Sequence, residues 1–220
     1  MTNRKTINEI SFLGGHSALD FVNTVDSRGE RWGPELLNSY GDLVAWARRV
    51  DLIDTNDAAA LLSQAAKSPT KARGELERAK DLREAMYRIF RSEADAAPVG
   101  EADLCLLNEI VHRAQSQRRL VDQAGAIQWQ QAPADKLETI SLRISWLAAE
   151  LLTATQVRRP VRVCEGQNCG WLFLDQSRNG HRRWCSDKTC GSHARVRKFR
   201  AERTVSSRDP SPRRTVKEPR

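Results

Sequence analysis

Apolar residues recur three and four positions apart in several segments before residue 157, which is the spacing of one face of an α-helix. Residues 43–50 and residues 101–113 show this pattern, and residues 76–89 show it in a longer segment that ends before Pro98. The clearest helix is expected over roughly 135–156, where the apolar stripe consists of Leu137, Ile140, Ile144, Leu147 and Leu151. We expect this helix to lie at the centre of an N-terminal core.

Other segments interrupt the helical pattern. Glycines and Pro34 within residues 10–37 predict loops around one short element at 16–25. Residues 119–122 and 126–130 flank Gly125 and predict a small β-hairpin. Arg158-Arg159-Pro160 ends the last helix. The pattern therefore predicts a mainly α protein with an N-terminal helical domain over residues 1–157.

Positive charge is concentrated after this boundary. Residues 158–220 contain 17 Lys and Arg against 6 Asp and Glu, whereas residues 1–157 contain 19 against 22. Such segregation is typical of a polyanion-binding module attached to a nearly neutral domain. Residues 204–220 combine Ser, Pro, Arg and Lys with almost no apolar residues, and they predict a disordered basic tail.

Four cysteines lie within the basic part of the chain. Cys164 and Cys169 form one C-x4-C pair, Cys185 and Cys190 form a second, and fifteen residues separate the pairs. Four thiolates at this spacing predict one structural Zn²⁺ ion, with no open coordination position for a catalytic water. Disulfides are the alternative, and a reducing cell interior favours zinc. The fifth cysteine, Cys105, lies among leucines and is expected in the core.

The residues around the cysteines predict a treble-clef-like zinc finger over 158–203. Strands are expected at 161–163 and 171–174, a turn at 177–180, a returning segment at 181–184, and a helix from near Cys190. On this helix Val196 and Phe199 are expected to pack on the hairpin, which leaves a cationic surface. Arginine suits bidentate contacts to phosphate or guanine in double-stranded DNA. The candidate nucleic-acid contacts are Arg178, Arg182, Arg183, Arg195, Arg197, Lys198 and Arg200. A solvated surface and an acidic protein partner are the alternatives.

The finger sequence resembles a known family. Cys169-Gly-Trp-Leu-Phe-Leu-Asp and Arg-Arg-Trp-Cys185, together with the cysteine spacing, are similar to the CGNR-type zinc finger. Residues 14–25 resemble the start of the helical ABATE domain that usually precedes it. The resemblance implies a bacterial DNA-binding regulator of the stress-induced class. This chain departs from the family after Gly191, where Ser192-His193 replaces the usual Asn-Arg. Ser192 is suited to capping a helix, and His193 is cationic only when protonated.

A polar face occurs in the N-terminal domain. If residues 16–25 are helical, His16, Asp20, Asn23 and Thr24 lie within about a 100° arc. These side chains predict a ligand-binding face, for which the alternative is structural hydrogen bonding to a neighbouring loop. His16 with Asp20 is also the arrangement of a catalytic base with its orienting partner. The sequence contains none of the common catalytic motifs, so we expect no enzyme.

Together these features predict a DNA-binding transcription regulator whose N-terminal domain senses a small molecule or forms a homodimer. An RNA-binding zinc protein is the alternative, with Trp171 or Trp184 stacking on unpaired bases. No segment reaches the ~18–20 apolar residues of a membrane span, and the N-terminus lacks the apolar centre of a signal peptide. We therefore expect a cytoplasmic protein with no membrane partner.

Overall fold

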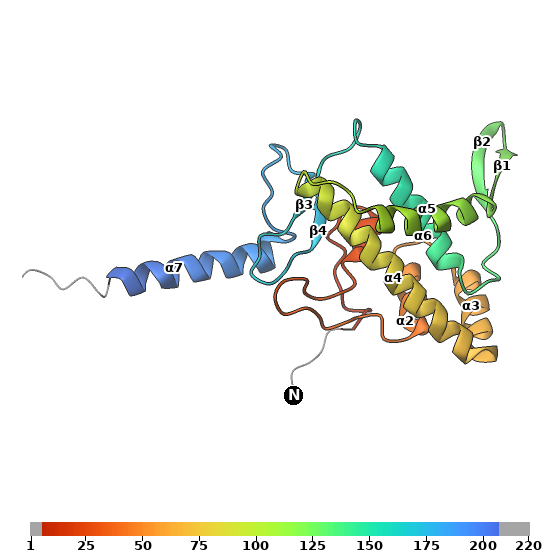
Figure 1. Cartoon of the computed structure of the whole chain (residues 1–220), viewed down its shortest axis with the longest axis horizontal. Coiled ribbons are helices and arrows are strands. Elements are labelled where there is room, and N and C mark those ends of the chain that lie inside the picture. The colour runs from red at the N-terminus through yellow and green to blue at the C-terminus, as the bar shows by residue number, and fades with distance from the viewer. Residues whose placement is uncertain (1–5, 207–220) are drawn as a thin grey trace, which may run out of the picture.

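The computed structural model describes residues 6–206, which form a mainly α structure (Figure 1). The N-terminal part contains six helices and one hairpin among the described residues: α1 (Ser17–Val22), α2 (Tyr40–Arg49), α3 (Thr55–Lys67), α4 (Pro69–Ala94), α5 (Glu101–Gln115), β1 (Arg118–Gln123), β2 (Ala126–Gln131) and α6 (Thr139–Thr153). The zinc-finger region contains β3 (Val161–Val163), β4 (Leu172–Leu174), the π-helical turn η1 (Asp187–Gly191) and α7 (Ser192–Ser206). The predicted fold class is confirmed.

The helices follow the predicted apolar stripes, with two differences. Helix α3 was not predicted, because Ala58 and Leu61 are the only residues that it buries. Its start is fixed by Asp54, whose side chain accepts a hydrogen bond from the backbone N–H of Asp57. Helix α6 is shorter than the expected 135–156, since Leu137 precedes its first turn.

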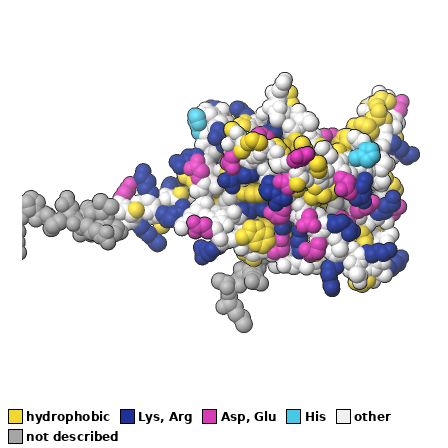
Figure 2. All heavy atoms as spheres, in the orientation of Figure 1, with side chains coloured by type: hydrophobic (Ala, Val, Ile, Leu, Met, Phe, Trp, Pro, Cys, Tyr) yellow, Lys and Arg dark blue, Asp and Glu magenta, His cyan; other side chains and the backbone are white. Residues whose placement is uncertain are grey.

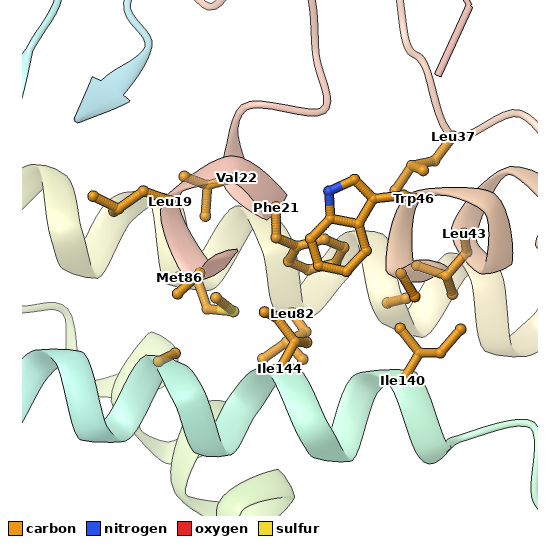
Figure 3. Close-up of a cluster of buried hydrophobic side chains, with 14 of the residues drawn as sticks. Leu19, Phe21, Val22, Leu37, Leu43, Trp46, Leu82, Met86, Ile140 and Ile144 are labelled. Atoms are coloured by element: carbon orange, nitrogen blue, oxygen red, sulfur yellow. The ribbon is translucent and has the colours of Figure 1, made fainter. Parts of the chain in front are cut away.

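The core of the N-terminal part is formed where α1, α2, α4 and α6 meet (Figure 3). Phe21 of α1 packs on Trp46 of α2, with ring centroids 4.8 Å apart. Leu82 of α4 and Ile144 of α6 are fully buried in the same cluster. The predicted central position of the last long helix is thus confirmed, and α1 packs into the same core.

The strands of the zinc-finger region differ from the expected hairpin. Strand β3 pairs antiparallel with β4, with Val161 opposite Leu174, so the hairpin closes across the first cysteine pair. Residues 181–184, the expected returning segment, form a loop and not a strand. The segment is held by the buried carboxylate of Asp175 and not by strand pairing. This carboxylate accepts hydrogen bonds from Ser177 and from the backbone N–H of Arg182.

Helix α7 continues directly from η1 and projects away from the rest of the protein (Figure 1). Val196 and Phe199 are therefore exposed, and their expected packing on the hairpin is wrong. The expectation for Cys105 is also wrong, because its place on α5 faces solvent. Residues 204–206 end α7, and the rest of the predicted tail lies outside the described residues. No helix in residues 6–206 is long and apolar enough to cross a membrane.

Candidate metal centre

The four predicted ligands converge at one point. The Sγ atoms of Cys164, Cys169, Cys185 and Cys190 all lie within 4.8 Å of one another. Cys169 and Cys185 have their Sγ atoms 3.7 Å apart, as do Cys185 and Cys190. Sulfurs at about 2.3 Å from a central zinc are about 3.8 Å apart at the corners of a tetrahedron. These spacings fit a zinc ion and are far longer than the about 2.05 Å of a disulfide bond.

Backbone groups support this arrangement of thiolates. The N–H groups of Gly166 and Cys185 point at Cys164 Sγ, with N···S distances of 3.4 and 3.2 Å. Hydrogen bonds from the thiols of Cys169 and Cys185, followed by these two N–H groups, lower the pKa of Cys164 and favour its thiolate. A Cβ atom at Gly166 would lie 2.7 Å from Cys190 Sγ, so only glycine fits beside the sulfurs.

This donor set fits one structural Zn²⁺ ion. Four cysteine thiolates complete a tetrahedral shell and leave no open position for water. Among the described residues these four cysteines are the group able to hold a metal ion, and neither His181 nor His193 belongs to it. When bound, the zinc ion joins the β3–β4 hairpin to the start of the helical run that contains Cys190.

The zinc-finger region is held on the N-terminal part by hydrogen bonds between side chains and backbone groups. The side chain of Asn23, just after α1, pairs with both backbone groups of Leu172: its Nδ2 donates to the carbonyl at 2.8 Å, and its Oδ1 accepts from the N–H at 3.0 Å. Trp171 donates its Nε1–H to the carbonyl of Val25 at 2.7 Å. Because all of these groups are buried, they fix β4 in register against α1.

A second set of contacts surrounds the first cysteine knuckle. The carbonyl of Cys169 accepts a hydrogen bond from the N–H of Arg28 at 2.8 Å. Asn168 holds the loop after α1 by donating to Ser27 Oγ and to the carbonyl of Arg31, and by accepting from the N–H of Arg31. Gly29 lies so close that a Cβ atom there would be 2.6 Å from the Cα of Asn168.

Charged residues hold that loop in turn on α4. The buried guanidinium of Arg83 donates to both carboxylate oxygens of Glu35 at 2.7 Å, and Arg28 binds Glu84 in the same bidentate way at 2.7 and 3.1 Å. Burial raises the pKa of each glutamate, but the hydrogen bonds and charges of the arginines outweigh it, so both pKa values are lowered. These ion pairs therefore anchor the loop that binds the first cysteine knuckle to α4.

Arg182 lies inside the finger, unlike the other predicted contacts. Its Nε donates to the carbonyl of Trp184 at 2.9 Å, and its Nη2 donates to the carbonyls of Leu13 and Cys185. Its guanidinium also stacks on the ring of Phe173, 4.2 Å from the centroid. Its Nε and Nη2 donors are thus bound to the chain around the metal centre.

The remaining predicted contacts are exposed. Arg178 and Arg183 lie on the loop between β4 and Cys185, and Arg183 pairs with Glu165 at 2.5 Å. On η1 and α7, Arg195 pairs with Asp187 at 2.8 Å and Lys198 approaches Glu202 at 3.9 Å. Figure 2 shows Lys and Arg side chains along the length of α7. The exposed cations of this helix are Arg195, Arg197, Lys198, Arg200 and Arg203.

Comparison with known families agrees with this division of the chain. The ABATE family, described as "Putative stress-induced transcription regulator", matches residues 15–155, and the CGNR zinc finger matches residues 160–203. The chain belongs to the ABATE family. In this ABATE protein the CGNR zinc finger follows directly, as the sequence predicted. No curated protein matches the chain.

The residues that replace the usual Asn-Arg of the CGNR zinc finger lie inside a continuous helical run. Ser192 follows η1 without a break and has helical backbone angles, so it does not cap a helix start as expected. The run begins after Ser186 instead. His193 is exposed and lines a cleft beside Cys190.

The polar face of the ABATE domain is engaged within the protein. His16 Nδ1 accepts from the N–H of Ala18 and caps α1, while Asp20 Oδ1 accepts from the N–H of Gly14 at 2.8 Å. Thr24 donates to the carbonyl of Phe21 and accepts from Arg83. Burial raises the pKa of Asp20 to about 6, against the opposing effect of the N–H groups of Gly14 and Leu13. The alternative of structural hydrogen bonds therefore describes these residues, and a ligand there stays a prediction.

Sequence reasoning missed the residues that dock the finger. Asn168, Arg28 and Glu84 were not singled out, and Asn23 was noted only as part of a polar face. One signal was available, since Gly29 and Gly170 mark close approaches of backbone on the two sides of this contact.

Proposed function

We propose that this ABATE protein is a transcription regulator that binds double-stranded DNA through its zinc finger. The observation that carries the proposal is α7, an exposed cationic helix. It follows the zinc ligand Cys190 in the same helical run. Its 15 residues span about 22 Å, and the major groove of DNA is wide enough to admit a helix. The family descriptions of a transcription regulator and a zinc finger support the same conclusion.

The cations divide into two roles under this proposal. Arg195, Arg197, Lys198 and Arg200 on α7, with Arg178 and Arg183 on the preceding loop, contact phosphates or base edges. Arg182 instead positions the finger, because its donors already bind backbone carbonyls. This assignment separates arginines that affect affinity directly from one that affects it through folding.

The proposal extends to the rest of the molecule in simpler terms. Residues 1–157 form a sensing or dimerising domain, residues 158–203 bind DNA, and residues beyond α7 add nonspecific attraction to phosphate. A homodimer would allow recognition of two half-sites. We assign the protein a binding role without a catalytic step, in the cytoplasm, where reducing conditions keep thiolates available for zinc.

Fluorescence-anisotropy titration of the zinc-loaded protein with a random DNA duplex, over a series of salt concentrations, tests this function. We expect a steep negative salt dependence that disappears on chelation of zinc. The double variant Arg197→Ala/Lys198→Ala should reduce the log–log slope by about one for each phosphate that these two side chains neutralise. Lys71→Ala/Arg73→Ala removes the same charges from the exposed face of α4 and is the matched control.

Two outcomes would contradict the proposal. An equal reduction of slope in both double variants would show that net charge alone drives binding. Tighter binding of a single-stranded RNA at the same salt concentration would favour the RNA alternative. Trp171 is buried with its Nε1–H bound to Val25, so base stacking would then fall to Trp184.

A further inference from the structure

A second candidate site lies on the β1–β2 hairpin, at the end of the molecule opposite α7 (Figure 1). Arg118 at the base of β1 is enclosed between two indole rings. Its guanidinium carbon is 5.0 Å from the centroid of Trp129 on β2 and 4.4 Å from that of Trp146 on α6. The centroids of the two rings are 6.3 Å apart, and the rings are arranged edge to face. A cation is thus held in place by the faces of two aromatic side chains.

Three buried hydrogen-bond donors of this cluster lack a partner among the described residues. The side chain of Arg118 is only 10% exposed, yet its Nε and Nη1 donate no hydrogen bond to a described residue. The buried Nε1–H of Trp146 is likewise without an acceptor among the described residues. The neighbouring charge is Glu150, which approaches Arg118 Nη1 to 3.7 Å and is half-exposed. Buried guanidinium donors are normally paired, so this cluster is suited to receiving an acceptor from outside.

A groove opens directly onto Arg118. Its volume is about 350 Å³, and it is lined by Ser116, Gln117, Arg118, Arg119, Gln130, Gln131, Ala132 and Pro133. A smaller hollow adjoins it and shares Arg118 and Gln131, with Trp146 in its wall. Ligand pockets usually occupy about 300–1,000 Å³, so this groove suits a small molecule. Both strands of the hairpin contribute to it at their paired ends, since Arg118 faces Gln131.

We propose that this groove binds a small organic carboxylate, held by the guanidinium of Arg118. The planar fork of arginine matches a carboxylate in two parallel hydrogen bonds. One buried guanidinium beside Glu150 balances a single negative charge better than the two charges of a phosphate. Pro133 in the groove and Trp146 in the wall of the adjoining hollow favour a ligand with a flat apolar group. This site does not involve DNA, so its test is independent of the proposed function.

Titration of the zinc-loaded, ¹⁵N-labelled full chain with sodium benzoate tests the proposal. Sodium chloride at equal ionic strength is the baseline, and the indole N–H resonances of Trp129 and Trp146 are the readout, assigned by single substitution to Phe. We expect saturable shifts of both resonances with benzoate and none with chloride. Arg118→Gln and Arg118→Lys should each weaken binding by roughly tenfold or more, because Lys keeps the charge but lacks the planar fork.

Further variants separate the effect of Arg118 from a general effect of charge or of misfolding. Arg73→Gln makes the same charge change on α4 and should leave the benzoate affinity unchanged. Trp129→Leu removes a half-exposed ring that contacts the guanidinium of Arg118, so it should weaken benzoate binding even if the Arg118 variants do not fold. Small ligands of this kind bind with Kd values of roughly millimolar order, so saturation should begin below about 20 mM benzoate. An absence of saturable shifts up to that concentration would overturn the proposal. An affinity unaffected by the Arg118 and Trp129 variants would also overturn it, and tighter binding of inorganic phosphate would overturn the carboxylate class.

Discussion

The two halves of the zinc finger each contain four arginines but differ in what their side chains contact. In the docked half, residues 161–185, Phe173 is fully buried and Arg182 binds three backbone carbonyls. In the projecting half, residues 187–206, Phe199 is 58% exposed and the cations of α7 face solvent. The difference teaches that an arginine-rich motif contains both structural and partner-binding residues. Substitutions of buried residues in the docked half should lower stability, whereas substitutions of the exposed cations should lower affinity.

Removal of a zinc ligand should have the largest effect. Cys185→Ser removes one of the four thiolate ligands and is expected to release zinc. The effect on folding should be large, because structural zinc contributes about 10–16 kcal/mol to the folding of small zinc modules. Hydrogen exchange should then rise over residues 160–203 and also in the loop after α1, which binds the first knuckle. Metal content measured with hydrogen exchange checks both expectations.

Cys105→Ser is the matched control for that variant, since Cys105 is exposed and lies outside the metal site. It should retain one zinc ion and the parent exchange pattern. Stoichiometric zinc in Cys185→Ser would contradict the ligand assignment.

A pair of phenylalanine substitutions tests the comparison of the two halves directly. Phe173→Ala should cost about 3–5 kcal/mol in the free energy of unfolding, as is usual for a buried aromatic residue. Phe199→Ala should change it by no more than about 0.5 kcal/mol, because the ring faces solvent. Urea unfolding of the zinc-loaded variants provides the measurement. Similar losses in both variants would mean that α7 packs on the protein in solution.

The Asn23 contact should have a smaller effect that leaves the metal site intact. Asn23→Ala leaves the buried N–H and carbonyl of Leu172 without partners, which should cost about 2–4 kcal/mol. Zinc content should stay the same, since no ligand changes. Asn179→Ala, on the exposed loop after β4, is the control and should match the parent protein in urea unfolding. A parent-like stability of Asn23→Ala would show that the finger is not held by this pair.

Asp20 should produce the smallest effect, and one that depends on pH. Burial raises its pKa to about 6 in the folded protein, so the folded state binds a proton more tightly than the unfolded state. The stability contributed by this residue is present below the unfolded pKa and is lost as pH rises through the folded pKa. Asp20→Asn lacks this loss. Its stability relative to the parent should therefore increase by roughly 1–2 kcal/mol between pH 5 and pH 8.

Urea unfolding at several pH values measures that difference, and taking it between two proteins removes the common effect of pH on zinc binding. Asp81→Asn, on the exposed side of α4, is the matched control. The same pH-dependent difference in both variants would contradict a special role for the buried carboxyl group.

The sequence predicted features that depend on local pattern. The long helices follow from their 3.6-residue period, and the metal site follows from cysteine spacing, because both are encoded within short segments. Helix α3 was missed since its stripe consists of little more than Ala58 and Leu61. The exposure of Phe199 was missed for a different reason: an apolar stripe does not reveal whether a partner surface exists.

The docking residues depend on contacts between distant segments. Asn23 and Leu172 are 149 positions apart, and nothing near Asn23 distinguishes an amide that binds solvent from one that binds a strand. Arg182 and Arg183 are neighbours, yet one binds carbonyls and the other is exposed. Such roles follow only from the tertiary arrangement, and residue type alone does not separate them.

The hydrogen bonds between Asn23 and Leu172 have a consequence for modular exchange. Two successive family matches suggest parts that can be recombined freely, but β4 takes part of its pairing from the segment after α1. A chimera that joins residues 158–203 to an unrelated domain would lack Asn23 and the loop that binds Asn168. Successful transplants should therefore carry residues 14–35 of the donor, or a designed surface with the same acceptors and donors. Recombination among relatives would for the same reason favour exchange of the two parts together.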